Sequence, residues 1–176
     1  MTPDHPITIG IFDGYSWIRC IGKGSFKNSP CLKEFADQRI QQGERLIVID
    51  LGACTGMDST FMGTLAGIAS RLSAFEGAAV HIADADDRNR RSLEDLGLDF
   101  LLEINPDPAT WLGHIPEIRQ RLVPAPSQPT GKIQNSKLVL DAHQTLSDLN
   151  DQNQKTFSNV IQLLQNEVPP DGSQKS

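Results

Sequence analysis

Three polar residues, Asp58, Ser59 and Thr60, lie between an apolar run and a helical pattern. The run Leu46–Leu51 (LIVIDL) predicts a strand covered on both faces, and Phe61 begins a helical period of apolar residues. Side chains in the first turn of a helix meet unpaired backbone N–H groups and the positive end of the helix dipole. Open α/β folds usually place their sites at this end of the sheet. Simple helix capping and a functional role both fit these residue types.

Asp50 is a second candidate, because it ends the same apolar run where the phosphate-accepting aspartate of response receivers lies. Such a site also needs an acidic pair that holds a divalent cation through oxygen ligands. Only Asp13 is available for that pair, inside a predicted turn, so we expect Asp50 to hydrogen bond nearby backbone. The segment Gly22-Lys23-Gly24 completes neither phosphate-loop pattern and is expected to be a plain connection.

Histidines and arginines show no pattern typical of a catalytic or metal site. The chain has neither an HExxH motif nor a GxSxG elbow, and no two of its histidines stand at i,i+4 spacing. The histidines are His5, His81, His114 and His143. Sequence spacing leaves a Ser-His-Asp triad open, but no catalytic pair can be assembled, so we expect no enzyme, cofactor or metal. We interpret His81 as a strand residue on the less apolar face, and Arg88, Arg90 and Arg91 as a solvated helix face.

Bulk composition narrows the classes of partner. The 176-residue chain has a net charge of −6 and no basic stripe, so nucleic-acid binding is not expected. The three cysteines lack CxxC spacing, which favours reduced thiols over a zinc or disulfide framework. No leader-like segment and no membrane-spanning apolar stretch stand in the sequence. We therefore expect a cytoplasmic protein with no membrane partner.

The order of the predicted elements, β-β-α-β-α-β-α-β-α, indicates an α/β fold. We expect a four-to-five-stranded mixed, mostly parallel sheet with helices packed on it and a hairpin at Asp13-Gly14 as an antiparallel edge. The predicted strands are Ile7–Ile11, Tyr15–Ile21, Leu46–Leu51, Ala78–Ala83 and Phe100–Ile104. The predicted helices are Asn28–Ile40, Phe61–Phe75, Asp84–Leu96 and Pro108–Leu122, the last kinked or split at Pro116. The predicted connector is Gly52–Met57.

A proline-rich segment separates this unit from a helical extension. We expect a domain over residues 5–122, a linker over 123–131, a helical extension over 132–168 and a disordered tail over 169–176. Two helices are predicted in the extension, separated by the polar interruption Asn150–Lys155. Short helices bury little alone, so they must dock on the domain, on a second copy or on a partner.

The run Leu46–Leu65 resembles the signature of STAS domains, the fold of bacterial anti-sigma-factor antagonists. In that family an apolar strand ending in Asp or Asn is followed by Asp-Ser-Ser/Thr-Gly-x-Gly-x-Leu at a helix start. The matching residues are Asp58, Ser59, Thr60, Gly63 and Leu65. Phe61 replaces the usual glycine, and Gly22–Ser25 lacks the acidic residue that the family has after its second strand. The C-terminal helices fall outside the family pattern.

The resemblance implies an anti-sigma factor antagonist that binds an anti-sigma factor serine kinase and is switched off by phosphorylation of Ser59. A PP2C-type phosphatase would reverse the mark, and Thr60 is the alternate acceptor. The expected partner-binding residues are Asp58, Ser59, Thr60, Phe61, Met62 and Gly63, with Met62 exposed. The alternative is a non-catalytic STAS scaffold or regulatory module, stressosome-like or transport-complex-like, without phospho-cycling.

Three points stay open at this stage. Phe61 is either a core residue or an enlarged apolar contact for a partner. Gly63 and Gly67 either let a partner approach closely or pack under a strand. A homodimer through residues 132–168 is a further option.

Overall fold

The computed structural model of the chain describes residues 6–126 and 131–167. The predicted tail (169–176), the middle of the predicted linker (127–130) and His5 lie outside the described residues. Among the described residues, no helix is both long enough and apolar enough to cross a membrane. Cys20, Cys31 and Cys54 are free thiols.

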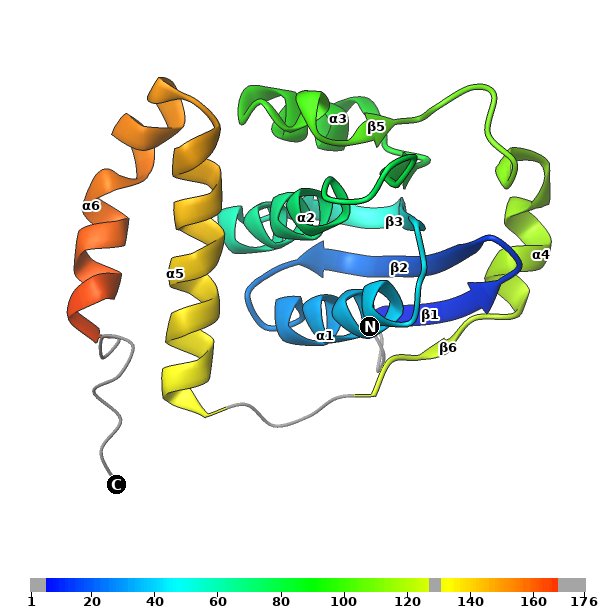
Figure 1. Ribbon diagram of the computed structural model, residues 1–176, viewed down its shortest axis with the longest axis horizontal. Coiled ribbons are helices and arrows are strands. Elements are labelled where there is room, and N and C mark those ends of the chain that lie inside the picture. Colours follow the sequence, from blue (N-terminus) through cyan, green and yellow to red (C-terminus); the bar gives the residue numbers. More distant parts are fainter. Residues whose placement is uncertain (1–5, 127–130, 168–176) are drawn as a thin grey trace.

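A single mixed sheet organises the fold (Figure 1), and its strands run in the order β5-β4-β3-β2-β1-β6 within the described residues. The strands are β1 (Ile7–Phe12), β2 (Tyr15–Gly24), β3 (Leu46–Met57), β4 (Ala79–Ala83), β5 (Glu103–Ile104) and β6 (Val123–Pro124). β2 through β5 pair in parallel, and β1 is antiparallel to both β2 and β6. The predicted α/β class and mostly parallel sheet are confirmed.

The initial hairpin forms where the sequence predicted it. β1 and β2 pair from Ile7–Cys20 to Phe12–Tyr15 around the turn at Asp13-Gly14. Gly14 has a φ of 90°, a left-handed conformation that glycine adopts without steric cost. The sheet is wider than expected because Val123 and Pro124, which we assigned to the linker, pair with β1 as a short edge strand.

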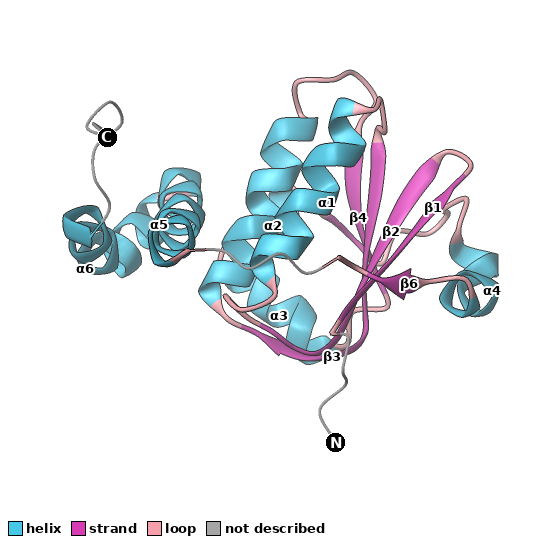
Figure 2. Ribbon diagram, turned by 90° about the horizontal axis from the view of Figure 1, so that it is seen from below, coloured by secondary structure: helices cyan, strands magenta, loops and turns pink. Residues whose placement is uncertain are grey.

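Helices cover both faces of the sheet (Figure 2). α1 (Ser29–Gln41), α2 (Ser59–Leu72) and α3 (Asp87–Asp95) belong to one side, and α4 (Ile115–Gln120) lies on the other. The larger core is built around α2, where Phe61, Leu65 and Ile68 are fully buried. A smaller core beneath α4 contains Trp17, Val48, Ala83, Trp111 and Ile118. Burial of these apolar surfaces is the main force that holds the layers together.

Several predicted boundaries differ from the structure. β3 continues to Met57 because the expected connector Gly52–Met57 pairs with β2, with two register shifts. A 3-10 turn occupies Leu98–Phe100, which leaves only Glu103–Ile104 for β5. Pro116 does not kink a long closing helix. It lies in the first turn of the short α4, where its missing N–H costs nothing.

The C-terminal residues form two helices, α5 (Lys132–Leu149) and α6 (Asp151–Glu167), which we call the C-terminal hairpin. Figures 1 and 2 show α5 lying between α2 and α6. The hairpin therefore docks on the domain of its own chain, which was one of the three possibilities raised by the sequence. The predicted interruption Asn150–Lys155 is wrong, since α6 begins at Asp151. Asn150 alone breaks the helix, and its side-chain oxygen accepts a 2.7 Å hydrogen bond from the backbone N–H of Asn153.

Candidate functional site

Asp58 caps the N-terminus of α2. Its Oδ1 accepts a hydrogen bond of 2.8 Å from the N–H of Phe61, two residues into the helix beyond Ser59. Its Oδ2 accepts a second bond of 2.9 Å from the N–H of Phe26, in the loop that follows β2. Asp58 therefore performs the capping that the sequence left open among three residues, and it also ties the loop before α1 to the start of α2.

Ser59 is the first residue of α2 and is half-buried. Its hydroxyl Oγ lies 2.8 Å from Nε2 of His143 in α5. Nδ1 of His143 lies 2.7 Å from the carbonyl oxygen of Val139, which can only accept a hydrogen bond. In the neutral imidazole, Nδ1 thus carries the proton and Nε2 accepts from the Ser59 hydroxyl. The predicted switch residue is bonded to the C-terminal hairpin rather than serving as the helix cap.

His143 is held firmly in place. Only 5% of its surface is exposed, and its ring packs edge-on against Phe157 of α6 with centroids 5.2 Å apart. No motif pointed to this role, because His143 is 84 residues from Ser59 along the chain. Its place on the inner face of an amphipathic helix, beside Ala142 and Leu146, was the only indication that it faces the domain.

The remaining predicted site residues are more buried than expected. Met62, predicted to be exposed, has only 8% of its surface accessible and belongs to the main core. Thr60, the alternate phosphate acceptor, is 5% exposed. Phe61 is fully buried and packs against Gly24, where an added Cβ would lie 2.8 Å from the ring. The core interpretation of Phe61 is confirmed, and its ring occupies space that a glycine at this position would leave empty.

Gly63 gives α5 a close approach to α2. A Cβ built on Gly63 would lie 2.8 Å from both the carbonyl carbon and the Cβ of Ala142. Neither interpretation made from the sequence describes this contact, because Gly63 packs under a helix of its own chain. At Gly67, one turn later, a Cβ would meet only the flexible end of Arg71, at 3.3 Å. The small residues of α2 therefore form a surface for a closely packed helix, and α5 occupies it.

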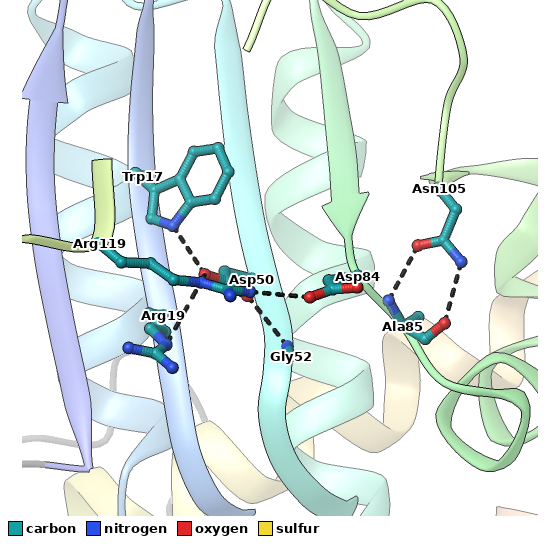
Figure 3. A network of polar contacts seen from close by, with 8 residues as sticks. All are labelled: Trp17, Arg19, Asp50, Gly52, Asp84, Ala85, Asn105 and Arg119. Atoms are coloured by element: carbon teal, nitrogen blue, oxygen red, sulfur yellow. Dashed lines mark hydrogen bonds and ion pairs between the residues drawn. The ribbon is translucent and has the colours of Figure 1, made fainter. Parts of the chain in front are cut away.

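A separate polar network surrounds Asp50 on the other face of the sheet (Figure 3). The buried carboxylate accepts two 2.9 Å bonds from Arg119 of α4, one of 3.1 Å from the Trp17 indole N–H, and one of 2.9 Å from the N–H of Gly52. Arg119 also contacts Asp84 at 2.9 Å. The bond to Asp50 raises the pKa of the Arg119 guanidinium, which stays charged.

This network fixes α4 to the middle of β3 and to Asp84, the residue after β4. The predicted bond from Asp50 to nearby backbone is confirmed at Gly52. A buried carboxylate with this many donors is already satisfied, which supports a structural role over that of a phosphate acceptor. The sequence could not identify Arg119, which is 69 residues from Asp50.

His81 and Arg90, two further polar residues considered from the sequence, have structural contacts. His81 accepts a 3.0 Å bond from the indole N–H of Trp111 and lies 3.1 Å from Glu103. It therefore lies on the face of the sheet that carries the smaller core, as the strand pattern indicated. Arg88, Arg90 and Arg91 are exposed on α3, and Arg90 pairs with Glu94 one turn away.

Solved structures of three anti-sigma factor antagonists or candidates resemble the fold. SpoIIAA, an anti-sigma factor antagonist solved in its unphosphorylated form, matches with a TM-score of 0.50 and 17% identity, over 64% of this chain and 97% of its own. An anti-sigma factor antagonist from Mycobacterium paratuberculosis matches with a TM-score of 0.52 and 20% identity, over 64% of this chain and 92% of its own. A candidate anti-sigma factor antagonist from Thermotoga maritima matches with a TM-score of 0.53 and 19% identity, over 64% of this chain and 94% of its own.

At these identities the structural likeness defines the fold alone. No curated protein matches the chain in sequence. The sequence model of the STAS domain matches residues 7–110, which include every strand from β1 to β5 and the Ser59 segment. The chain belongs to the STAS domain family.

Proposed function

We propose that this protein is an anti-sigma factor antagonist that binds an anti-sigma factor serine kinase and is switched off by phosphorylation of Ser59. The observation that carries the proposal is that the helix cap of α2 and the candidate phosphate acceptor are two different residues, Asp58 and Ser59. Asp58 supplies the helix cap, so the hydroxyl of Ser59 is not needed to hold the helix together. It stands at the first position of α2 in a domain whose solved relatives are anti-sigma factor antagonists.

Electrostatics favour phosphate at this place within the domain itself. A phosphoserine carries about −1.5 to −2 charges at neutral pH. The N-terminus of α2 offers unpaired N–H groups and a favourable dipole to such a group. The modification therefore leaves the STAS fold intact, and its effect falls on whatever is docked nearby.

A docked partner would have to desolvate the phosphate beside the carboxylate of Asp58. An unpaired charge buried in an interface costs several kcal/mol, and about 4 kcal/mol already changes affinity by roughly a thousandfold. The unphosphorylated domain binds the kinase, and the phosphorylated domain releases it. A PP2C-type phosphatase resets the cycle.

The direct test is to incubate the protein with ATP and each anti-sigma factor serine kinase of the same organism, and to locate the phosphate by mass spectrometry. We expect one phosphate on Ser59, none on the Ser59→Ala variant, and unchanged labelling of a Thr60→Ala variant. Calorimetry should then show that phosphorylation weakens kinase binding by at least about a hundredfold. Labelling at other positions only, or equal affinity of the two forms, would contradict the proposal.

One observation favours a second candidate, a non-catalytic STAS scaffold or regulatory module without phospho-cycling. Ser59 is half-buried under α5 and bonded to His143, an arrangement that suits a permanently structural serine. On this interpretation, pull-down from cells should recover a stable complex without a kinase, and Ser59→Ala should leave that complex unchanged.

A further inference from the structure

The C-terminal hairpin contacts the domain at three places, two of them at the start of α2. Nε2 of His143 bonds to Ser59, and the backbone of Ala142 closes over Gly63. At the far end, the side chain of Asn153 donates a 2.8 Å bond to the carbonyl oxygen of Leu96, just after α3. The hairpin thus lies on the surface around Ser59 that a kinase or a binding partner would have to reach.

The hairpin is an addition to the STAS fold rather than part of it. The STAS sequence model ends at residue 110, before α5 begins. Solved relatives are matched over 92–97% of their own length by 64% of this chain, so their fold is complete without a counterpart of the remainder. The α2 face that α5 covers can therefore exist uncovered in this architecture.

A phosphate on Ser59 and the docked hairpin exclude each other. The Oγ–Nε2 distance of 2.8 Å leaves no room for a phosphoryl group between the two side chains. The hydroxyl proton that Ser59 donates to His143 is lost when Oγ is esterified. The added charge would also stand beside the buried ring of His143, which packs against Phe157.

We infer that the C-terminal hairpin is an autoinhibitory cover, which occupies the docking surface at the start of α2 and must leave before Ser59 is phosphorylated or a partner binds. This inference rests on the proposed function for the identity of the partner. The coupling is reciprocal: docking of the hairpin slows phosphorylation, and phosphorylation releases the hairpin. The measured affinity for a partner equals the affinity of the uncovered form multiplied by the fraction of molecules that are uncovered.

The test displaces the hairpin in the full chain without altering the STAS surface. Ala142→Glu places a charged side chain where α5 meets Gly63, and Ser158→Glu adds the same charge on the exposed face of α6 as a matched control. Hydrogen exchange measured by mass spectrometry should show faster exchange across α5 in Ala142→Glu alone. The kinase should then phosphorylate Ser59 at least about tenfold faster in that variant than in the wild type or in the control.

A milder variant guards against misfolding. His143→Phe keeps an aromatic ring against Phe157 and removes the bond to Ser59, together with the bond to the carbonyl oxygen of Val139. The Val139 bond lies within α5, so only the Ser59 bond is lost between the hairpin and α2, and the rate should rise by up to about tenfold. A released hairpin with an unchanged phosphorylation rate would overturn the inference and leave the proposed function standing.

A third arm needs no kinase. Ser59→Glu should speed exchange across α5, whereas the neutral Ser59→Ala should do so much less. If no variant is phosphorylated, even with the hairpin released, the proposed function fails. The exchange rates of the Ser59 variants still show whether charge at residue 59 expels the hairpin. Unchanged or slower exchange in Ser59→Glu would overturn the inference, because it would mean that His143 pairs with the charge and holds the cover in place.

Discussion

Asp58 and Asp86 form a natural pair for measuring what the α2 cap contributes. Both have extended backbone at the N-cap position, and each accepts a 2.8 Å bond from the N–H three residues later, at Phe61 and Asn89 respectively. Only Asp58 accepts a second bond, from the N–H of Phe26. Replacing each with alanine therefore separates the cap from the tie between two loops.

The expected costs follow from these bonds. Loss of a helix cap costs about 1 kcal/mol, which is the whole loss for Asp86→Ala. Asp58→Ala also loses the bond to Phe26, and since that bond is exposed it adds only about 1 kcal/mol more. For a chain of this size, 1 kcal/mol lowers the melting temperature by about 2–4 °C. Asp58→Ala should thus lower it by about 4–8 °C.

Urea unfolding followed by circular dichroism measures both variants on one scale. Asp58→Asn is an informative third variant, because its single amide oxygen can replace only one of the two carboxylate oxygens. Its cost should be about half that of Asp58→Ala, or about 1 kcal/mol. Equal destabilisation by Asp58→Ala and Asp86→Ala would refute the idea that Asp58 ties the β2–α1 loop to α2.

Three further predictions test the cores and the assembly. Phe61→Ala should cost about 3–5 kcal/mol of unfolding free energy, because its side chain is fully buried. The control Phe26→Ala, at a residue that is 51% exposed, should cost about 0.5 kcal/mol or less. Similar costs for the two variants would contradict a core role for Phe61. Arg119→Ala should cost about 3–5 kcal/mol of unfolding free energy, because it leaves the Asp50 carboxylate buried without its main partner. Arg121→Ala, at an exposed residue of the same segment, should cost under about 1 kcal/mol. A cost for Arg119→Ala as small as that of the control would show that water satisfies Asp50. A homodimer through residues 132–168 that uses the outer face of α6 should become monomeric in Leu163→Glu, at a residue 68% exposed, as measured by light scattering. An unaffected dimer would place the interface elsewhere.

Local patterns predicted the fold well. The turn at Asp13-Gly14, the buried run Leu46–Leu51 and the helical period that begins at Phe61 each reflect short-range physics, and each element formed at the expected place. Boundaries failed where longer-range pairing decided them. β3 extends to Met57 because β2 supplies partners, and Val123 joins the sheet because the free edge of β1 lies beside it.

The candidate site was only half predictable for the same reason. The Asp58-Ser59-Thr60 segment could be recognised from its place between strand and helix. The burial of Met62 and the bond from Ser59 to His143 depend on where α5 docks, and an amphipathic helix specifies that it must dock without specifying the surface. Gly63 was a partial signal, since its missing side chain indicated a close approach but not by which helix.

The position of Ser59 sets two electrostatic effects against each other. Phosphate at the N-terminus of α2 gains about 0.3–1 kcal/mol from the helix dipole, so the STAS domain by itself tolerates the charge. The contact with α5 loses the Ser59–His143 bond, about 1 kcal/mol, and must in addition accommodate a desolvated charge at a cost of several kcal/mol. The second effect is larger, and it acts on the hairpin rather than on the domain. Modification of Ser59 is therefore expected to change which surface is covered without changing the stability of the sheet beneath it.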